Sequence, residues 1–200
     1  MQEILPGLFH WTAVHPRIQV QVSSYYLREP GVLIDPLIPA EGLDWFRERV
    51  EPRHALLTNR HHHRHCAEFE QAFGCTVWCN EEGLHEFTRG EKVRPFTAGD
   101  LLPGGIESHE VGVLCPDETA LRIPVAEGAL AFADGIVRDD GGMLTFVPDR
   151  LLGDGPVAIR QGLKAAYARL LNLEFDHLLF AHGLPWIGGG KQALRQFVSS

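Results

Sequence analysis

The stretch that decides the fold is "LLTNRHHHRHCAEF", which runs from Leu56 to Phe69. The apolar segment "HALLT" leads into it and reads as a buried strand that ends at Thr58. Four histidines follow within residues 61–65, interrupted only by Arg64. The run is internal and interrupted, which argues against an expression tag. A metal site, an altered metal site and a solvated histidine cluster all remain open from this stretch alone.

Two later strands end on side chains of the same kind. "LAFAD" ends on Asp134, and "LLFAHG" ends on His182 followed by glycine. A polar side chain at the end of a buried strand is well placed to point into a cleft. Each of these residues alone could be a capping or core residue. Three such endings in one chain favour a shared cleft.

The rest of the pattern alternates runs of strands with helices. Apolar spacing and β-branched content predict strands at 8–15, 18–27, 31–35, 54–58, 75–79 and 176–183, strand-like structure over 104–134, and helices at 41–50, 67–73, 156–173 and 191–198. This order predicts an α/β domain with two sheets in the middle and helices outside, and a single domain over 1–200.

Composition excludes several classes of protein. The 200 residues carry a net charge of −8 and no basic stripe, so nucleic acid and anionic membrane are not expected partners. No basic region and long apolar run open the chain, and no stretch approaches the ~20 apolar residues of a membrane span. The four cysteines are too few for a disulfide scaffold. We expect a cytoplasmic protein with a small-molecule substrate, and a homo-oligomer is compatible with the sequence.

These motifs together resemble the metallo-β-lactamase fold superfamily of metal-dependent hydrolases. "LPGLFHW", "SSYYL" and "GVLIDPLIP" resemble its first three strands, and the similarity extends over nearly the whole chain. The resemblance implies a four-layer αβ/βα sandwich of two mixed β-sheets with outer helices. It also implies one or two metals at the shared edge of the two sheets.

The superfamily signature is T-H-x-H-x-D-H-x-G-G, and two registers are open. Anchored on Thr58, the signature places Asn59 and His61 at the first two histidines, His63 at the aspartate and Arg64 at the third histidine. The small residues Cys66 and Ala67 then fall on the two glycines, which favours this register. The other register places His61, His63, His65 and Cys66 on the four ligand positions.

The resemblance implies a set of site residues. Cys115 stands at the turn histidine, Asp134 at the bridging aspartate and His182 at the last histidine, so the expected ligands are His61, His63, Cys115, Asp134 and His182. Asp134 and Arg64 are the expected catalytic residues. A guanidinium cannot bind a metal, so Arg64 would hold Asp134 or a substrate anion and leave room for one ion. That ion is expected to be zinc, with iron and manganese as alternatives.

Two functions follow from the resemblance. One is a metal-dependent hydrolase of a small ester, thioester, lactone or phosphoester, which uses metal-bound hydroxide. The alternative is a degenerate, non-catalytic relative whose pocket binds a ligand without metal. A salt bridge from Arg64 that fills the metal position would favour the alternative.

Overall fold

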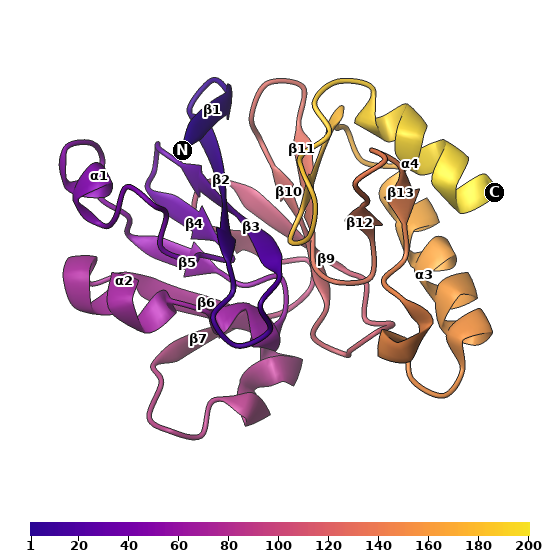
Figure 1. Ribbon diagram of the computed structural model, residues 1–200, viewed down its shortest axis with the longest axis horizontal. Helices are drawn as coiled ribbons and strands as arrows, with labels where there is room; N and C mark the ends of the chain where they lie inside the picture. Colours follow the sequence, from indigo (N-terminus) through magenta and orange to yellow (C-terminus); the bar gives the residue numbers. More distant parts are fainter.

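Two β-sheets face each other in the structure, a computed structural model that describes residues 1–200 (Figure 1). The first sheet has seven strands in chain order: β1 (Gln2–Leu5), β2 (Leu8–Val14), β3 (Gln21–Leu27), β4 (Val32–Ile34), β5 (His54–Leu56), β6 (Thr76–Asn80) and β7 (Val93–Phe96). Strands β1 to β4 pair antiparallel and β4 to β7 pair parallel. The first sheet is therefore mixed.

The second sheet has five strands in the order β14-β11-β10-β9-β8. They are β8 (Leu101–Leu102), β9 (Ile106–Glu110), β10 (Thr119–Ile123), β11 (Ala129–Phe132) and β14 (His177–Phe180). Only β11 and β14 pair parallel, so this sheet is also mixed. A small hairpin of β12 (Val137–Arg138) and β13 (Leu144–Thr145) follows β11.

Helices cover the outer face of each sheet. In Figure 1, α1 (Asp44–Arg47) and α2 (Cys66–Phe73) lie outside the first sheet, and α3 (Pro156–Leu170) and α4 (Gly190–Ser199) lie outside the second. Three short 3₁₀ segments complete the chain: η1 (Arg60–His63), η2 (Glu81–Glu86) and η3 (Asp149–Leu151). The predicted four-layer αβ/βα sandwich is confirmed.

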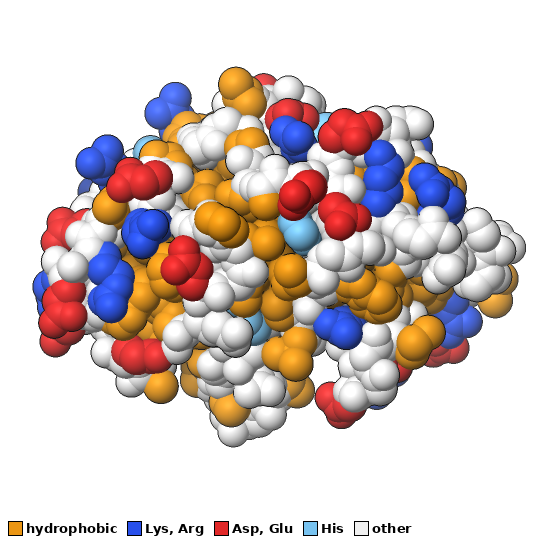
Figure 2. Space-filling model, turned by 90° about the horizontal axis from the view of Figure 1, so that it is seen from above, with side chains coloured by type: hydrophobic (Ala, Val, Ile, Leu, Met, Phe, Trp, Pro, Cys, Tyr) orange, Lys and Arg blue, Asp and Glu red, His pale blue; other side chains and the backbone are white.

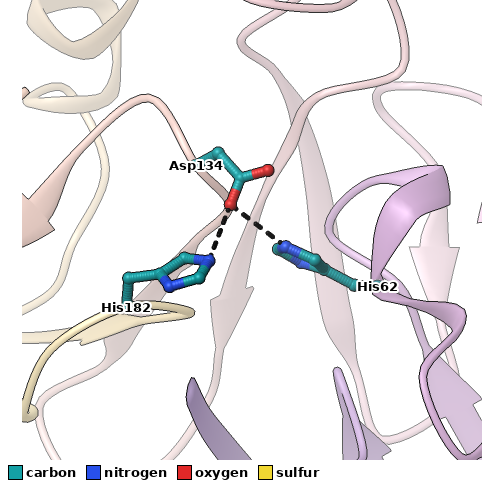
Figure 3. Close-up of side chains that lie close together, drawn as sticks. All are labelled: His62, Asp134 and His182. Carbon is teal, nitrogen blue, oxygen red and sulfur yellow. Dashed lines mark hydrogen bonds and ion pairs between the residues drawn. The ribbon is translucent and has the colours of Figure 1, made fainter. Parts of the chain in front are cut away.

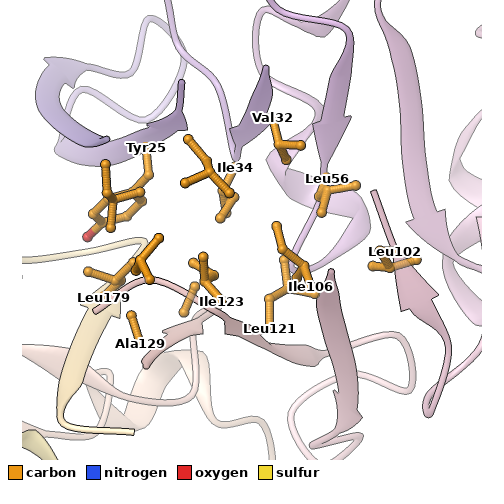
Figure 4. Packing of buried hydrophobic residues seen from close by; sticks show 14 of the residues in the cluster. Tyr25, Val32, Ile34, Leu56, Leu102, Ile106, Leu121, Ile123, Ala129 and Leu179 are labelled. Atoms are coloured by element: carbon orange, nitrogen blue, oxygen red, sulfur yellow. The ribbon is translucent and has the colours of Figure 1, made fainter. Parts of the chain in front are cut away.

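Alternation along the strands explains the layers. In β4, Ile34 points into the core between the two sheets, while its neighbour Leu33 joins the core under α1 and α2. In β14, Leu179 faces the first sheet and Phe180 packs under α3 and α4. Because successive strand side chains point to opposite faces, a strand buried on both faces reads as a continuous apolar run. Figure 4 shows the core between the sheets, including Ile34 and Leu179.

Several predicted elements differ from the structure at their edges. The helix expected over 41–50 is only Asp44–Arg47, preceded by Gly42 at φ 73°. Strands β1, β7 and the β12–β13 hairpin were not predicted. Strand β7 contains Pro95, and proline is tolerated there because β7 is the last strand of its sheet. No helix has the length and the apolar run needed to cross a membrane.

The Tyr25 side chain links β3 of the first sheet to β14 of the second by hydrogen bonds. Its hydroxyl donates to the carbonyl of Phe180 and accepts the amide of the same residue, each at 2.9 Å. Tyr25→Phe leaves both buried backbone groups without a partner, and we expect it to lower the free energy of unfolding by about 1–3 kcal/mol. Urea denaturation measures this loss, and an unchanged midpoint would contradict it. The m-value should stay constant, since the fold itself is retained.

Candidate metal centre

Four strand ends converge at one edge of the sandwich. Asp35 follows β4 and Thr58 follows β5 in the first sheet, while Asp134 follows β11 and His182 follows β14 in the second. Because β4 pairs parallel with β5, and β11 with β14, the carboxyl ends of each pair lie together. A crevice outside the carboxyl ends of parallel strands is a common place for ligands to bind.

Asp35 is the buried anchor of this edge. Its carboxylate accepts the Thr58 backbone amide at 2.9 Å, the Thr58 hydroxyl at 2.6 Å and the Nδ1–H of His62 at 3.0 Å. Asp35 is 2% exposed and adopts φ 48°. Burial alone would raise the pKa of this carboxyl, but the positive charge of His62 and these hydrogen bonds hold it below the ordinary value.

His62 lies in η1, in the middle of the histidine run. The Asn59 side chain caps this segment by accepting the backbone amide of His61, and His62 departs from helical geometry at φ −92°, ψ 18°. That kink directs the His62 ring inward, where it is only 4% exposed. With Nδ1 held by Asp35, Nε2 is left to face the second sheet, 3.1 Å from Asp134 Oδ1.

Three side chains from distant parts of the chain meet here (Figure 3). Asp134 Oδ1 lies 3.1 Å from His62 Nε2 and 3.1 Å from His182 Nε2. One ligand atom from each of His62, Asp134 and His182 falls within 4.8 Å of the others. The other carboxylate oxygen, Oδ2, accepts the Asn59 side-chain amide at 2.7 Å. We call His62, Asp134 and His182 the HDH cluster.

The charges in the HDH cluster reinforce one another. Burial alone would lower the pKa of His62, but the carboxylates of Asp35 and Asp134 together raise it to about 9. Burial alone would raise the pKa of Asp134, but the charge of His62 and the hydrogen bonds of both histidines hold it well below its usual range. Without metal, the HDH cluster therefore carries a proton between His62 and Asp134 at neutral pH.

Several solved structures share this arrangement of sheets and helices. Over 99% of this chain, a B3 metallo-β-lactamase with an active-site glutamic acid superposes with a TM-score of 0.67 at 17% identity, covering 85% of that chain. A metallo-β-lactamase family protein from Thermus thermophilus superposes with a TM-score of 0.68 at 16% identity, over 98% of this chain and 80% of that one. The chain has the metallo-β-lactamase fold.

A third solved structure is of similar length. TTHA1623, solved in a di-iron-bound form, superposes with a TM-score of 0.66 at 22% identity, over 92% of this chain and 96% of that chain. No protein-family model and no curated protein matches the chain. The likeness to the metallo-β-lactamase fold therefore rests on the arrangement of sheets and helices at 16–22% sequence identity.

Two glycines allow the metallo-β-lactamase fold to bring the HDH cluster together. Gly183 follows His182 at φ 102°, and a Cβ there would stand 2.1 Å from the Arg138 carbonyl oxygen. A Cβ on Gly135, after Asp134, would stand 2.3 Å from the Tyr167 hydroxyl. Both turns therefore need glycine, because any larger residue would collide with the adjacent Arg138 carbonyl or Tyr167 hydroxyl of the same chain.

The structure shifts the candidate ligand in the histidine run by one residue. Both registers of the metallo-β-lactamase signature assign a ligand position to His61 and neither assigns one to His62. The ring of His61 is exposed and lies outside the HDH cluster, as does that of His63, which stacks on Phe87 with ring centroids 5.4 Å apart. His61, Asp134 and His182 do line one cleft, as expected.

Cys115 lies away from the HDH cluster. It sits beside Asp117, which accepts the Arg60 backbone amide at 2.6 Å and forms a salt bridge with the Arg60 guanidinium. Burial, together with the neighbouring Asp117 and Glu118 carboxylates, raises the pKa of the Cys115 thiol. A protonated thiol is a poor metal ligand, so the environment of Cys115 does not favour the expected role.

Arg64 does not pair with Asp134. One of its terminal nitrogens, Nη1, donates to the backbone carbonyls of Ser23 at 2.7 Å and Asp35 at 2.6 Å. It thereby ties β3 to the end of β4, and no salt bridge from Arg64 fills the metal position. The arrangement that would favour a degenerate, metal-free pocket is absent. Of the two expected roles for Arg64, holding Asp134 is wrong.

Asp35 and His62 are site residues that sequence analysis missed, and Asn59 stood at the first histidine position of the signature without an expected role. Asp35 ends the buried run "VLID" and so obeys the strand-end rule that identified Asp134 and His182. His62 carries no such signal, because the kinked 3₁₀ segment decides which of three consecutive histidines points inward.

The HDH cluster lies in a cleft of about 380 Å³. Eighteen residues line it, among them six histidines and four arginines against three carboxylates. The turn between β2 and β3, the histidine run and the segment after η2 form its walls. The cleft is large enough for a small molecule.

Proposed function

We propose that the chain is a metal-dependent hydrolase that binds one divalent ion through His62, Asp134 and His182. A single observation carries this proposal. Two imidazole nitrogens and one carboxylate oxygen converge from three separate segments, and a buried carboxylate orients the central ring. Metal-binding histidines commonly donate their second ring N–H to a carboxylate in this way.

The donor set fits a metal ion in distance and in chemistry. Ligand atoms about 2.0–2.2 Å from one tetrahedral ion stand about 3.3–3.6 Å from each other. The two histidine nitrogens each lie 3.1 Å from Asp134 Oδ1, so little movement is needed. Three protein ligands with at least one open position are typical of catalytic rather than structural zinc sites.

The neighbouring residues support this arrangement. Asp35 holds Nδ1 of His62, which leaves the Nε2 lone pair free for a ligand once the shared proton departs. Asn59 holds Oδ2 of Asp134 and leaves Oδ1 facing the two rings. The ligand atoms of His62 and Asp134 are therefore each positioned by a hydrogen bond to the other end of the same side chain.

We propose zinc as the metal, and a single ion. Nitrogen and oxygen donors suit zinc, and they also suit iron and manganese. TTHA1623, similar in fold, was solved in a di-iron form, so iron is the first alternative to test. A second ion lacks a comparable donor group, since His62, Asp134 and His182 form the one cluster of at least three metal-binding side chains within reach of each other.

The substrate class we propose is a small ester, thioester, lactone or phosphoester. When bound, a divalent ion supplies a Lewis acid and a water of lowered pKa. The chain contributes the cleft, the orientation of the ligands and a carboxylate, Asp134, beside the open position. The hydrogen bond from Asn59 to Oδ2 would hold that carboxylate in place while Oδ1 faces the ion.

Metal analysis followed by activity tests the proposal. The untagged chain is purified, its metal content is measured by mass spectrometry, and ester, lactone, thioester and phosphoester substrates are assayed. We expect about one equivalent of metal and a hydrolysis that is lost on chelation and restored by zinc, iron or manganese. A chain that takes up none of these metals, even after refolding with them, would exclude the hydrolase and leave the metal-free binding protein.

A further inference from the structure

Two histidines that line the cleft, His15 and His65, each have one ring nitrogen hydrogen-bonded to the backbone and one without a partner. His15, in the turn between β2 and β3, uses Nδ1 to accept the backbone amide of Arg17 at 3.2 Å. His65, at the end of the histidine run, uses Nδ1 to accept the backbone amide of Ile38 at 3.0 Å. Both histidines line the cleft that holds the HDH cluster.

Those two contacts decide which nitrogen carries the proton. A backbone N–H can only donate, so each Nδ1 must be an unprotonated acceptor. The remaining ring proton of His15 and of His65 is therefore on Nε2, which becomes a donor. Neither Nε2 has a partner in the protein, and neither is among the fully buried polar atoms without one, so both remain accessible.

The charged residues beside these two rings, Arg64 and Arg17, are positive and also favour an anion. Arg64 lines the same cleft, and its Nη2 is buried without a partner while its Nη1 holds two carbonyls. Arg17 is exposed on the β2–β3 turn and also lines the cleft. Burial and the positive charges of Arg64 and Arg17 lower the pKa of His15, which keeps that ring neutral and its Nε2–H a donor.

The carboxylates of the cleft lie elsewhere or are already paired. Asp134 belongs to the HDH cluster, and Glu91 is engaged by the backbone and guanidinium of Arg89. Glu86 is the remaining acid, and it belongs to η2 rather than to the β2–β3 turn. The chain as a whole carries a net charge of −8, and the face in Figure 2 mixes both signs. The concentration of hydrogen-bond donors at His15, Arg17, Arg64 and His65 is thus confined to this part of the cleft.

We propose that His15, His65, Arg64 and Arg17 form an anion subsite, so that the small molecule taken by this cleft bears a carboxylate or phosphate group. Anionic oxygens accept hydrogen bonds and donate none, which matches a wall that offers only donors. This proposal deepens the proposed hydrolase, because it names the second recognition group of the substrate, and it rests on that function only for the reaction at the HDH cluster.

Anion binding to the metal-free chain tests the subsite separately from the metal. The protein is stripped with chelator and desalted, then titrated with inorganic phosphate, with succinate and with its neutral diamide, succinamide, while histidine ring signals are followed by NMR. We expect saturable shifts of His15 and His65 with at least one anion and none with succinamide. Phosphate alone or succinate alone would identify which anion the subsite takes.

Matched variants locate the binding. His15→Phe and His65→Phe keep a ring but remove the donor, and each should weaken the anion that binds by about tenfold. His85→Phe, an exposed histidine that does not line the cleft, is the control and should change nothing. Equal affinity for succinate and succinamide, no saturable binding of either anion, or unchanged affinity in both folded variants would overturn the subsite. Metal loss in other variants would not affect these results.

Discussion

His62→Ala should abolish metal binding, while His61→Ala should leave it intact. The two residues are neighbours in the same 3₁₀ segment, yet the ring of His62 is 4% exposed and faces Asp134, whereas His61 is exposed. Removing one of three protein ligands should lower metal affinity at least ~100-fold, since even outer hydrogen-bond partners contribute ~10–100-fold. Metal content of the two purified variants, measured by mass spectrometry, gives the comparison directly.

The controls for this pair follow from the fold. His62→Ala also empties a buried position between two carboxylates, so its circular dichroism and melting transition must show a folded chain before its metal content is interpreted. Asp134→Asn and His182→Ala should lose metal as His62→Ala does. Should His61→Ala lose metal and His62→Ala keep it, His61 would be the ligand, as both signature registers expect, and the HDH cluster would not be the metal site.

The fold was predictable because its signals are repeated along the chain. Strands such as β4, β5, β11 and β14 are apolar on both faces, so their sequences are short apolar runs that end in a polar residue. Parallel pairing then brings those polar ends to one edge. This strand-end pattern was enough to predict that Asp134 and His182 lie at a shared cleft, and the structure places both there.

The inward-pointing histidine of the run was harder to predict, because the geometry of a single turn determines which ring faces the cluster. Histidines at 61, 62 and 63 have the same chemistry, and periodicity does not distinguish them in a segment that is neither α-helix nor strand. The Asn59 cap and the kink at His62 decide which ring points inward. The anchor that holds that ring, Asp35, comes from a different strand. Matching the signature residue by residue therefore missed by one position.

Arg64 shows a different limit of sequence analysis. Its charge suggested a partner among the carboxylates, but its guanidinium instead satisfies the carbonyls of Ser23 and Asp35. Backbone carbonyls at the ends of strands need donors when they are buried, and sequence does not display that need. The same guanidinium keeps Nη2 unpaired beside the cleft. One residue thus completes the sheet edge and contributes to the proposed anion subsite.

The stability of the metal-free chain should fall as the pH rises from about 7 to 9. The carboxylates of Asp35 and Asp134 raise the pKa of His62 from 6.5 to about 9 in the folded protein, despite its burial. A group whose folded pKa is raised contributes its full stability below the unfolded pKa, and that stability is lost as the pH rises through the folded value. The loss from His62 should be about 3 kcal/mol.

Bound metal should cancel this trend. The ion and the proton compete for Nε2 of His62, so metal binds more tightly as the pH rises and stabilises the fold by mass action. Urea unfolding between about pH 7 and 9 should therefore give a stability that falls with pH without zinc and stays nearly level with saturating zinc. His62→Gln should flatten the metal-free curve above about pH 7. A metal-free stability that rises over this range would show that no proton is held between His62 and the two carboxylates.

Glu118 contributes to the same measurement at lower pH and can be separated from His62. Burial raises the pKa of Glu118 to about 7, and its Oε2 has no hydrogen-bond partner. Ionising it in the folded chain is unfavourable, so the contribution of Glu118 to stability should decline between about pH 4.5 and 7, opposite to the rise contributed by His10, whose pKa is lowered to about 4. Glu118→Gln keeps an oxygen for the Gly135 amide, which Glu118 accepts at 2.8 Å. This variant should remove the earlier decline and leave the later one, because the proton of His62 is held by Asp35 and Asp134 and not by Glu118.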